Sequence, residues 1–334
     1  MKVLFHTNTL NYRGTTVAVT DYARYNQEIL GNESVILYNG SIPYERDMGT
    51  ESLVLTELKK QFNVMSYDGN NREVELNRIC KDQGVDVAYF IKSGAKNGEL
   101  PPDREPDVDI LAHTRTCVHA VFQVYQPHGD RYAYVSEWLA NRMSPVDKPT
   151  PFVPHIVNLP PPNKDIRDFL GIPKDAIVFG RYGGYTTFDL SFVKEHIRTV
   201  LATNSNIYFL FANTEPFIDH PNVRYIKEIA TPQGKSNFID ACDAMLHARG
   251  RGESFGLSIA EFLFHNKPVL AWRGGQDQNH LEMLKDSDLI YSEIDVVDKM
   301  LNIKELAGKE QWSDRVKQYA PDVVMNKFEE VFLK

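Results

Sequence analysis

Residues 249–272 read RGRGESFGLSIAEFLFHNKPVLAW, a glycine-rich loop followed by an apolar helix, a stop at Pro268 and an apolar strand. We expect the helix to begin near Gly256 and to end at 265. A second possible start is Ser258, because Ser258-x-x-Glu261 has the pattern of a capping box. That start would leave only about seven helical residues against a mean of about eleven, so we favour Gly256.

The start of this helix is a candidate anion site. Backbone N–H groups and the helix dipole attract an anion such as phosphate at a helix N-terminus. Gly250, Gly252 and Gly256 let a ligand approach the backbone. Arg249 and Arg251 supply positive charge. Gly14, next to Arg13, offers the same arrangement at the start of the chain's first predicted helix. The alternative interpretation is that these glycines serve only as turns between strands and helices.

Two acids flank the same helix start, Glu253 in the loop and Glu261 inside the helix. The two glutamates are eight positions apart, and eight helical residues span about 12 Å. Paired catalytic carboxyls of glycoside hydrolases lie roughly 5 to 9.5 Å apart. The pair therefore indicates two contacts to different parts of one extended ligand.

Upstream of this stretch, apolar strands alternate with amphipathic helices. The first half gives strands at 3–6, 34–39, 63–67, 85–91 and 132–136, and helices at 15–30, 52–62, 71–83 and from 137. The segment 110–123 fits either a strand or a buried loop. This βαβ alternation predicts a parallel sheet with helices on its faces.

The alternation stops in a proline-rich segment and then starts again. Residues 145–162 carry seven prolines, more than a helix or a central strand tolerates, which indicates a linker. Further strands are expected at 177–183, 206–213, 223–226, 244–248 and 269–272, with helices at 189–201 and 235–242. We therefore expect an α/β protein of two Rossmann-like domains, 1–157 and 158–317, facing across a cleft, with ligands beyond the carboxyl ends of the strands.

The composition limits the class of protein. The 334 residues are 42% hydrophobic with a formal charge of −8, which argues against a nucleic-acid partner. The three cysteines have no metal-site spacing and are too few for a disulfide framework. No apolar stretch is long enough for an integral membrane segment, so we expect a cytoplasmic protein.

The run from Glu253 to Glu261, followed by Asn266-Lys-Pro-Val, resembles the E-x7-E signature of retaining glycosyltransferases of family 4, which have the GT-B fold. Three further segments resemble the family in the same order: Arg13-Gly14, YVSEWLANRM at 134–143, and GRYGG at 180–184.

The resemblance implies roles for these residues. Glu253 would contact the transferring sugar and Glu261 the ribose hydroxyls. His119 would match a histidine of the family's first domain that lies near the reacting centre. The implied donor-site residues are Gly14, Arg181, Arg249, Ser254, Phe255, Gly256, Leu257 and Glu261.

Three positions depart from the family pattern. The lysine that follows the strand-end arginine by five or six residues is missing after Arg181, and Arg249 or Arg251 would have to supply its charge. The family's Pro-Asn-Gly reads 154–156 Pro-His-Ile, and its Pro-Ser reads His247-Ala248.

Other candidates are weaker. A histidine in an apolar run is more often a core residue, so His119 has this second interpretation, and His113 and His128 compete with it. Asp107-x-Asp109 and Asp286-x-Asp288 are D-x-D patterns of a kind that binds a divalent metal, but two matches are about what chance gives. We therefore expect no metal site.

The sequence thus predicts a metal-independent glycosyltransferase that needs no cofactor. Its co-substrate would be a nucleotide-diphosphate sugar, UDP- or GDP-linked, and its acceptor a glycan or another hydroxyl compound. The first domain would serve the acceptor and the second the donor, and we expect the C-terminal helix 318–334 to pack back on the first. Two alternatives are open: a nucleotide-sugar epimerase on the same fold, and a catalytically silent carbohydrate-binding protein.

Overall fold

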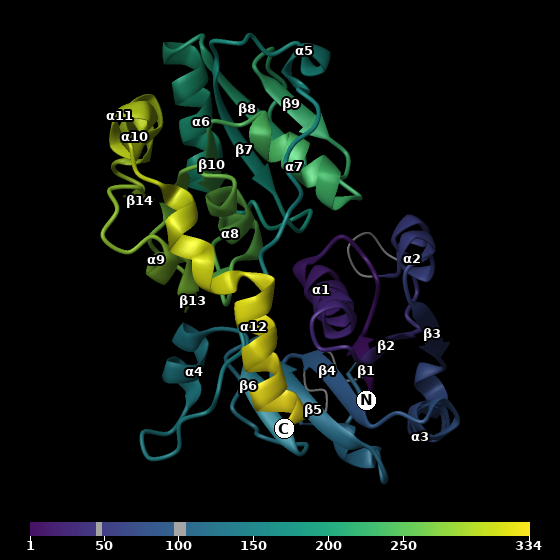
Figure 1. Cartoon of the computed structure of the whole chain (residues 1–334). Helices are drawn as coiled ribbons and strands as arrows, with labels where there is room; N and C mark the ends of the chain where they lie inside the picture. Colours follow the sequence, from purple (N-terminus) through teal and green to yellow (C-terminus); the bar gives the residue numbers. More distant parts are fainter. Residues whose placement is uncertain (45–48, 97–104) are drawn as a thin grey trace. The chain divides into compact units, whose positions relative to one another are not determined.

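A computed structural model describes residues 1–44, 49–96 and 105–334 and divides into two compact units (Figure 1). The first contains Met1–Ile156 and, from the end of the chain, Tyr319–Lys334. The second contains Val157–Gln318.

The first unit is built on a six-stranded sheet in the order β3-β2-β1-β4-β5-β6, in which all neighbouring strands are parallel. Its strands are β1 (Lys2–Thr7), β2 (Glu33–Asn39), β3 (Asn63–Tyr67), β4 (Val87–Lys92), β5 (Arg115–Ala120) and β6 (Arg131–Tyr134). The ambiguous segment 110–123 therefore contains a strand. All six residues of β4 are buried, as expected for a central parallel strand covered on both faces.

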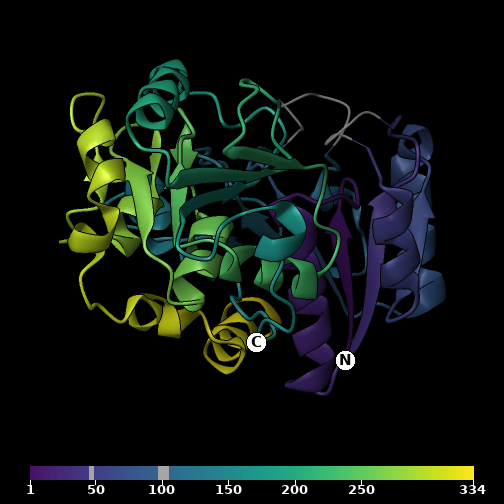
Figure 2. The ribbon, with the colours of Figure 1, turned by 90° about the horizontal axis from the view of Figure 1, so that it is seen from above.

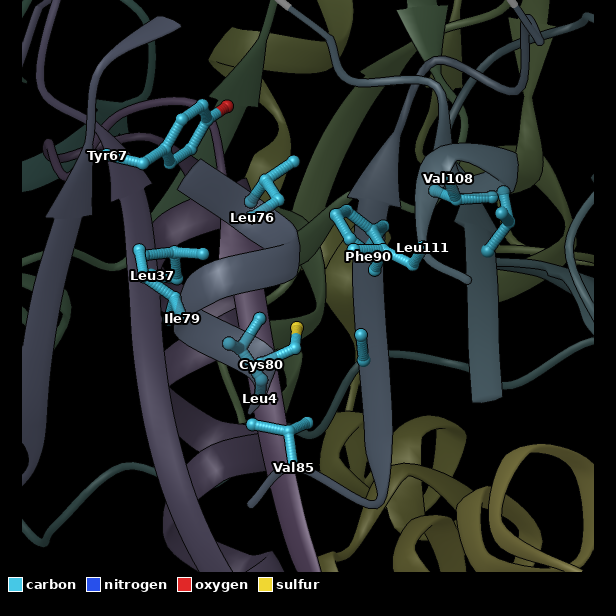
Figure 3. Packing of buried hydrophobic residues seen from close by; sticks show 12 residues of the cluster. Leu4, Leu37, Tyr67, Leu76, Ile79, Cys80, Val85, Phe90, Val108 and Leu111 are labelled. Carbon is cyan, nitrogen blue, oxygen red and sulfur yellow. The ribbon is translucent and has the colours of Figure 1, made fainter. Parts of the chain in front are cut away.

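The helices of the first unit are α1 (Gly14–Glu28), α2 (Ser52–Lys59), α3 (Arg72–Gln83), α4 (Glu137–Met143) and α12 (Pro321–Phe328). Figure 3 shows how α3 covers the sheet, with Leu76 and Ile79 directed toward Leu4 of β1, Leu37 of β2 and Phe90 of β4. The rest of the α3 surface is strongly polar, so α3 is stabilised by burial of this one apolar face against the sheet.

The second unit repeats the plan in the order β14-β12-β10-β7-β8-β9, again with all neighbours parallel. Its sheet strands are β7 (Ile177–Tyr182), β8 (Ile207–Ala212), β9 (Val223–Ile226), β10 (Ala244–His247), β12 (Val269–Trp272) and β14 (Ile290–Tyr291). Its helices are α5 (Arg167–Leu170), α6 (Ser191–Thr203), α7 (Pro232–Asp240), α8 (Leu257–Phe264), α9 (Asn279–Met283), α10 (Val296–Leu301) and α11 (Ile303–Ala307). Both sheets thus have the strand order of a Rossmann-like fold.

The proline-rich segment differs in part from the expected linker. Phe152 forms a parallel bridge with Tyr134 of β6, and the chain from Val153 to Val157 is buried. Val153 N–H donates to the Tyr134 carbonyl at 2.9 Å, so the segment extends the sheet at its β6 edge. Proline has no backbone N–H to donate. It is compatible with an edge strand, because only one side of an edge strand is hydrogen-bonded to a neighbour.

The C-terminal segment packs on the first unit. Phe328 of α12 stacks on Tyr22 of α1 with ring centroids 5.0 Å apart, and Figure 2 shows this end of the chain beside α1. The Cys117 thiol donates to the Phe332 carbonyl at 3.2 Å, and the Arg115 guanidinium donates to the Leu333 carbonyl.

Within residues 1–44, 49–96 and 105–334, no helix has both the length and the apolar character needed to cross a membrane.

Candidate active site

The candidate site lies at the carboxyl edge of the second sheet, between β7 and β10. These two strands are neighbours in the sheet, but the chain leaves them toward opposite sides, which makes this the switch point of the topology. Open parallel sheets bind ligands in the crevice that such a switch point creates. Arg181 and Tyr182 end β7, and His247 ends β10, so all three lie at this edge.

A short two-stranded sheet fixes the loop that follows β10. β11 (Gly252–Glu253) pairs in parallel with β13 (Asp277–Gln278), and the Asp277 N–H donates to the Arg251 carbonyl at 2.9 Å. The approach is so close that a Cβ at Gly252, whose φ is +79°, would lie 1.9 Å from the Asp277 carbonyl oxygen. Glycine is therefore required at 252 for the loop to hold this shape.

Helix α8 begins where the sequence indicated. Gly256 is its N-cap with φ +95°, and Leu257 is its first residue, so Ser258 does not start the helix. The buried Asn279 side chain donates to the Phe255 carbonyl at 2.7 Å, which anchors the residue before the cap. Ser254 and Leu257 are partly exposed at this helix start, and Phe255 is buried. The backbone N–H groups of the first turn can receive an anion.

Glu253 is a largely buried carboxylate with a cationic partner. Arg249 Nη1 donates to its Oε2 at 2.8 Å, and His247 Nε2 lies 3.5 Å from its Oε1. Burial alone would raise the pKa of Glu253, but the charge of Arg249 and the contact with His247 outweigh it and lower the pKa to about 2. The carboxylate is therefore ionised at any ordinary pH.

Two buried histidines near Glu253, His247 and His280, were not among the candidates found from the sequence. The rings of His247 and His280 lie 4.8 Å apart between centroids, and the two side chains are buried. His280 Nε2 donates to the Trp272 carbonyl at 2.8 Å, and burial lowers the pKa of His280 to about 4. The replacement of the family's Pro-Ser by His247-Ala248 was the only sequence signal for this pair.

Glu261 lies inside α8 and is also engaged on both oxygens. Lys235 Nζ of α7 donates to Oε1 at 2.8 Å, and the Tyr182 hydroxyl donates to Oε2. The Lys235 ammonium also lies over the Tyr182 ring at 5.5 Å from the centroid. Sequence reasoning missed Lys235 and Tyr182, because they come from two other elements that only the folded sheet brings to α8.

The Arg181 guanidinium donates to oxygens of its own neighbourhood. Nη1 donates to the Thr214 hydroxyl at 2.6 Å, and Nη2 donates to the Thr187 hydroxyl at 2.6 Å and the Gly184 carbonyl at 2.9 Å. Arg181 is buried, so these bonds order the turn after β7. The residue lies at the predicted edge, and a contact of its charge with a diphosphate stays a prediction.

Both arginines suggested as substitutes for the family lysine have carboxylate partners. Arg249 contacts Glu253, and Arg251 Nε donates to the buried Asp277 at 2.7 Å. Lys235, paired with Glu261, is a third cation within the same unit. Each of these three cations thus pairs with a carboxylate of the second unit.

The remaining donor-site candidate, Gly14, belongs to the first unit. It is the first residue of α1 and is exposed, with Arg13 as the N-cap. The α1 start therefore has the helix-terminus geometry that the sequence indicated.

The structure places His119 in the core of the first unit, and the position near a reacting centre that the resemblance implies stays a prediction. The ring is fully buried, and Nδ1 lies 2.6 Å from the Tyr89 hydroxyl while Nε2 lies 2.9 Å from the Val153 carbonyl. Burial lowers the pKa of His119 to about 4. Both ring nitrogens are hydrogen-bonded within the first unit and Phe332 lies against the ring, which favours the interpretation of His119 as a core residue.

The structure also describes the competing histidines, His113 and His128, and Asp109 of the first D-x-D pair. His113 is exposed, and His128 Nε2 accepts from the buried Lys92 ammonium at 3.1 Å. Asp109 pairs with Lys96 at 2.7 Å. Across the described ranges 1–44, 49–96 and 105–334, no cluster of three or more histidine, cysteine or acidic side chains has a geometry that could hold a metal ion.

No family model and no curated protein matches this sequence. Among solved structures, the chain is similar to Anabaena HepE in complex with UDP-glucose, with a TM-score of 0.72 at 12% identity over 99% of this chain and 98% of that one. It is similar to sucrose-phosphate synthase from Thermosynechococcus elongatus, with a TM-score of 0.71 at 12% identity over 100% and 98%.

A third similar structure is a Listeria monocytogenes protein assigned as a UDP-N-acetylglucosamine 2-epimerase, with a TM-score of 0.58 at 10% identity over 97% and 94%. Together with the two six-stranded parallel sheets, these likenesses show the predicted fold class, GT-B with two Rossmann-like domains.

Proposed function

We propose that this protein is a metal-independent glycosyltransferase, similar to the retaining enzymes of family 4, that moves a sugar from a nucleotide-diphosphate sugar to a hydroxyl acceptor. One observation carries the proposal. Two carboxylates, Glu253 and Glu261, flank the start of α8 at the switch point of a GT-B domain, and each has a cationic partner. A nucleotide-sugar donor has a diphosphate between its sugar and its ribose. The helix start can therefore contact the diphosphate, and the two carboxylates on either side of it can contact the sugar and the ribose.

In this proposal the α8 start receives the diphosphate, with Arg249 and Arg181 adding positive charge. Glu261 accepts hydrogen bonds from the ribose hydroxyls, and Glu253 contacts the transferring sugar. The donor nucleotide is UDP or GDP, and UDP has the support that the similar HepE structure is a complex with UDP-glucose.

The chemistry follows from the leaving group. Breaking the bond between the anomeric carbon and the phosphate oxygen leaves negative charge on the diphosphate, which fixed dipoles and cations stabilise without reorganisation. The acceptor hydroxyl attacks from the same face, and its proton passes to the departing phosphate, so configuration is retained.

The first unit supplies the acceptor side, and the protein acts in the cytoplasm. The buried free thiols of Cys80, Cys117 and Cys242 fit a reducing compartment.

An epimerase is the second candidate, because one similar structure is assigned to that class. An epimerase would convert the donor in the absence of acceptor. A catalytically silent carbohydrate-binding protein would bind without turnover.

The test is a panel of UDP-, GDP-, ADP- and TDP-sugars, scored first by thermal stabilisation and then by product analysis. A ligand at one hundred times its Kd stabilises the folded state by about 2.7 kcal/mol, a shift that is readily measured. We expect one nucleotide class to stabilise the protein and to be turned over with release of nucleoside diphosphate. Epimerised donor as the product would favour the second candidate, and stabilisation without any turnover would favour the silent protein.

A further inference from the structure

The side chain of His247 lies against the carboxylate of Glu253. It is the last residue of β10, and its backbone carbonyl accepts from the Tyr291 hydroxyl at 2.6 Å, which fixes the strand end. Its ring is buried, and Nε2 lies 3.5 Å from Glu253 Oε1. Arg249 occupies the other oxygen of the same carboxylate at 2.8 Å.

The two ring nitrogens of His247 make no hydrogen bond with any residue that the structure describes. Glu253 Oε1 is an acceptor 3.5 Å from Nε2 of this ring. A buried ring N–H without a partner is costly, so a small closing movement toward the carboxylate is favoured. Nε2 must then carry a proton, because a carboxylate oxygen can only accept a hydrogen bond.

His280 supports the ring of His247 from its face. Their centroids are 4.8 Å apart, and His280 is itself fixed by its Nε2–H donated to the Trp272 carbonyl at 2.8 Å. Since a carbonyl can only accept, this bond sets the tautomer of His280. Glu253, Arg249 and the buried His280 are thus charged or titratable groups of this cluster around His247.

We propose that His247 is a positioning residue for Glu253: its Nε2–H donates to Oε1 while Arg249 holds Oε2, so that the carboxylate faces the donor sugar in one orientation. This inference rests on the proposed function, because it takes Glu253 as the sugar contact. A carboxylate held at both oxygens by fixed donors cannot rotate away from its ligand, and such preorganisation matters most where charge develops in the transition state.

The activity test compares His247→Ala, His247→Gln and Tyr291→Phe. The alanine variant should lower kcat for donor turnover roughly ten- to hundredfold and leave KM for the donor nearly unchanged, since the loss falls on the transition state. The glutamine amide places an N–H near the position of Nε2 and should restore most of the rate. Tyr291→Phe loosens the same strand end but keeps the His247 ring, so it should lower the melting temperature and reduce kcat less than His247→Ala does.

A measurement that needs no activity separates this inference from the proposed function. Imidazole ¹⁵N–¹H NMR, with the His247 signal assigned by the glutamine variant, should show Nε2 protonated and its proton moved downfield by the carboxylate. Glu253→Gln should move that proton back upfield. An unprotonated Nε2, or a proton that does not respond to Glu253→Gln, overturns the inference even if the wild type is an active transferase. If no donor is turned over but the NMR result is as expected, the proposed function fails and the contact stands.

Discussion

Glu261 and Glu253 carry the same charge in different surroundings, and this difference is the residue-scale basis for giving them different roles. Glu261 is buried inside α8, with Lys235 and Tyr182 on its two oxygens. Glu253 lies in the preceding loop and contacts Arg249 and His247. An acid held within the helix suits a ligand part that is bound firmly, and an acid in the loop suits the reacting part.

We expect Glu261→Gln to weaken binding of the bare nucleoside diphosphate by about 1 to 3 kcal/mol, because charged hydrogen bonds to ribose would be lost. Isothermal titration calorimetry measures this directly. Tyr182→Phe is the matched control: it removes one donor from the same carboxylate but keeps its charge, so its effect should be smaller. Unchanged nucleotide affinity in folded Glu261→Gln protein would rule out the ribose assignment.

At this scale the sequence was informative about the acids and silent about their partners. The two glutamates and the α8 start could be found because they fall in one short stretch whose order resembles a known signature. Lys235 is 26 residues from Glu261 in the chain, and Tyr182 is 79 residues away. No local pattern can indicate such contacts, since they arise only when parallel strands bring their carboxyl ends to one edge.

At the scale of elements, the paired strands β11 and β13 give the loop before α8 its shape. Neither strand has an apolar pattern that sequence periodicity could detect, because each contains only two residues. The apolar strands of four or more residues, by contrast, were predicted to within a few residues from their apolar runs, as β8 and β10 illustrate.

Gly252→Ala tests this element. A Cβ at position 252 would lie 1.9 Å from the Asp277 carbonyl oxygen, so β11 and β13 must separate. We expect a loss of about 4 kcal/mol or more in the free energy of unfolding, or a folded protein that no longer binds nucleotide. The control is Gly171→Ala, where φ is also positive but the nearest atom is an ordinary contact at 3.6 Å. That change should cost only about 1 to 2 kcal/mol, as judged by urea unfolding. Equal losses for the two variants would contradict the account of β11 and β13.

At the scale of the whole molecule, buried histidines in both units make the free energy of unfolding depend on pH. Burial lowers the pKa of His6 to about 3 and that of His119 and His280 to about 4, so these side chains stay neutral in the folded protein near neutral pH. In the unfolded chain they would titrate near about 6.5. The unfolded state therefore binds more protons between these values, and stability is present above about 6.5 and is lost as pH falls toward about 4.

We expect the free energy of unfolding, measured in urea at pH 7, 6 and 5, to fall on acidification with a slope that approaches about 1.4 kcal/mol per pH unit for each such histidine. His119→Gln removes one of these groups and should flatten the slope by about that amount, whatever it does to stability at pH 7. An identical slope in the wild type and this variant would mean that His119 is not a neutral core residue.

The proposed charge arrangement also predicts independence from divalent cations. Since the helix start and the arginines would stabilise the leaving diphosphate, donor turnover should be unchanged after treatment with EDTA. Loss of activity that manganese or magnesium restores would indicate a metal-bound donor and would require a different site.

The most direct test of the central claim, that Glu253 contacts the sugar at the start of α8, is donor turnover by Glu253→Gln measured beside its melting temperature and its nucleoside-diphosphate affinity. A contact that strengthens only in the transition state changes kcat and leaves ground-state nucleotide binding intact. We predict a folded variant with near-normal nucleotide affinity and a release of nucleoside diphosphate that is reduced at least tenfold. A folded Glu253→Gln protein that turns over donor at the wild-type rate would contradict the claim and remove the main support for calling this chain a transferase.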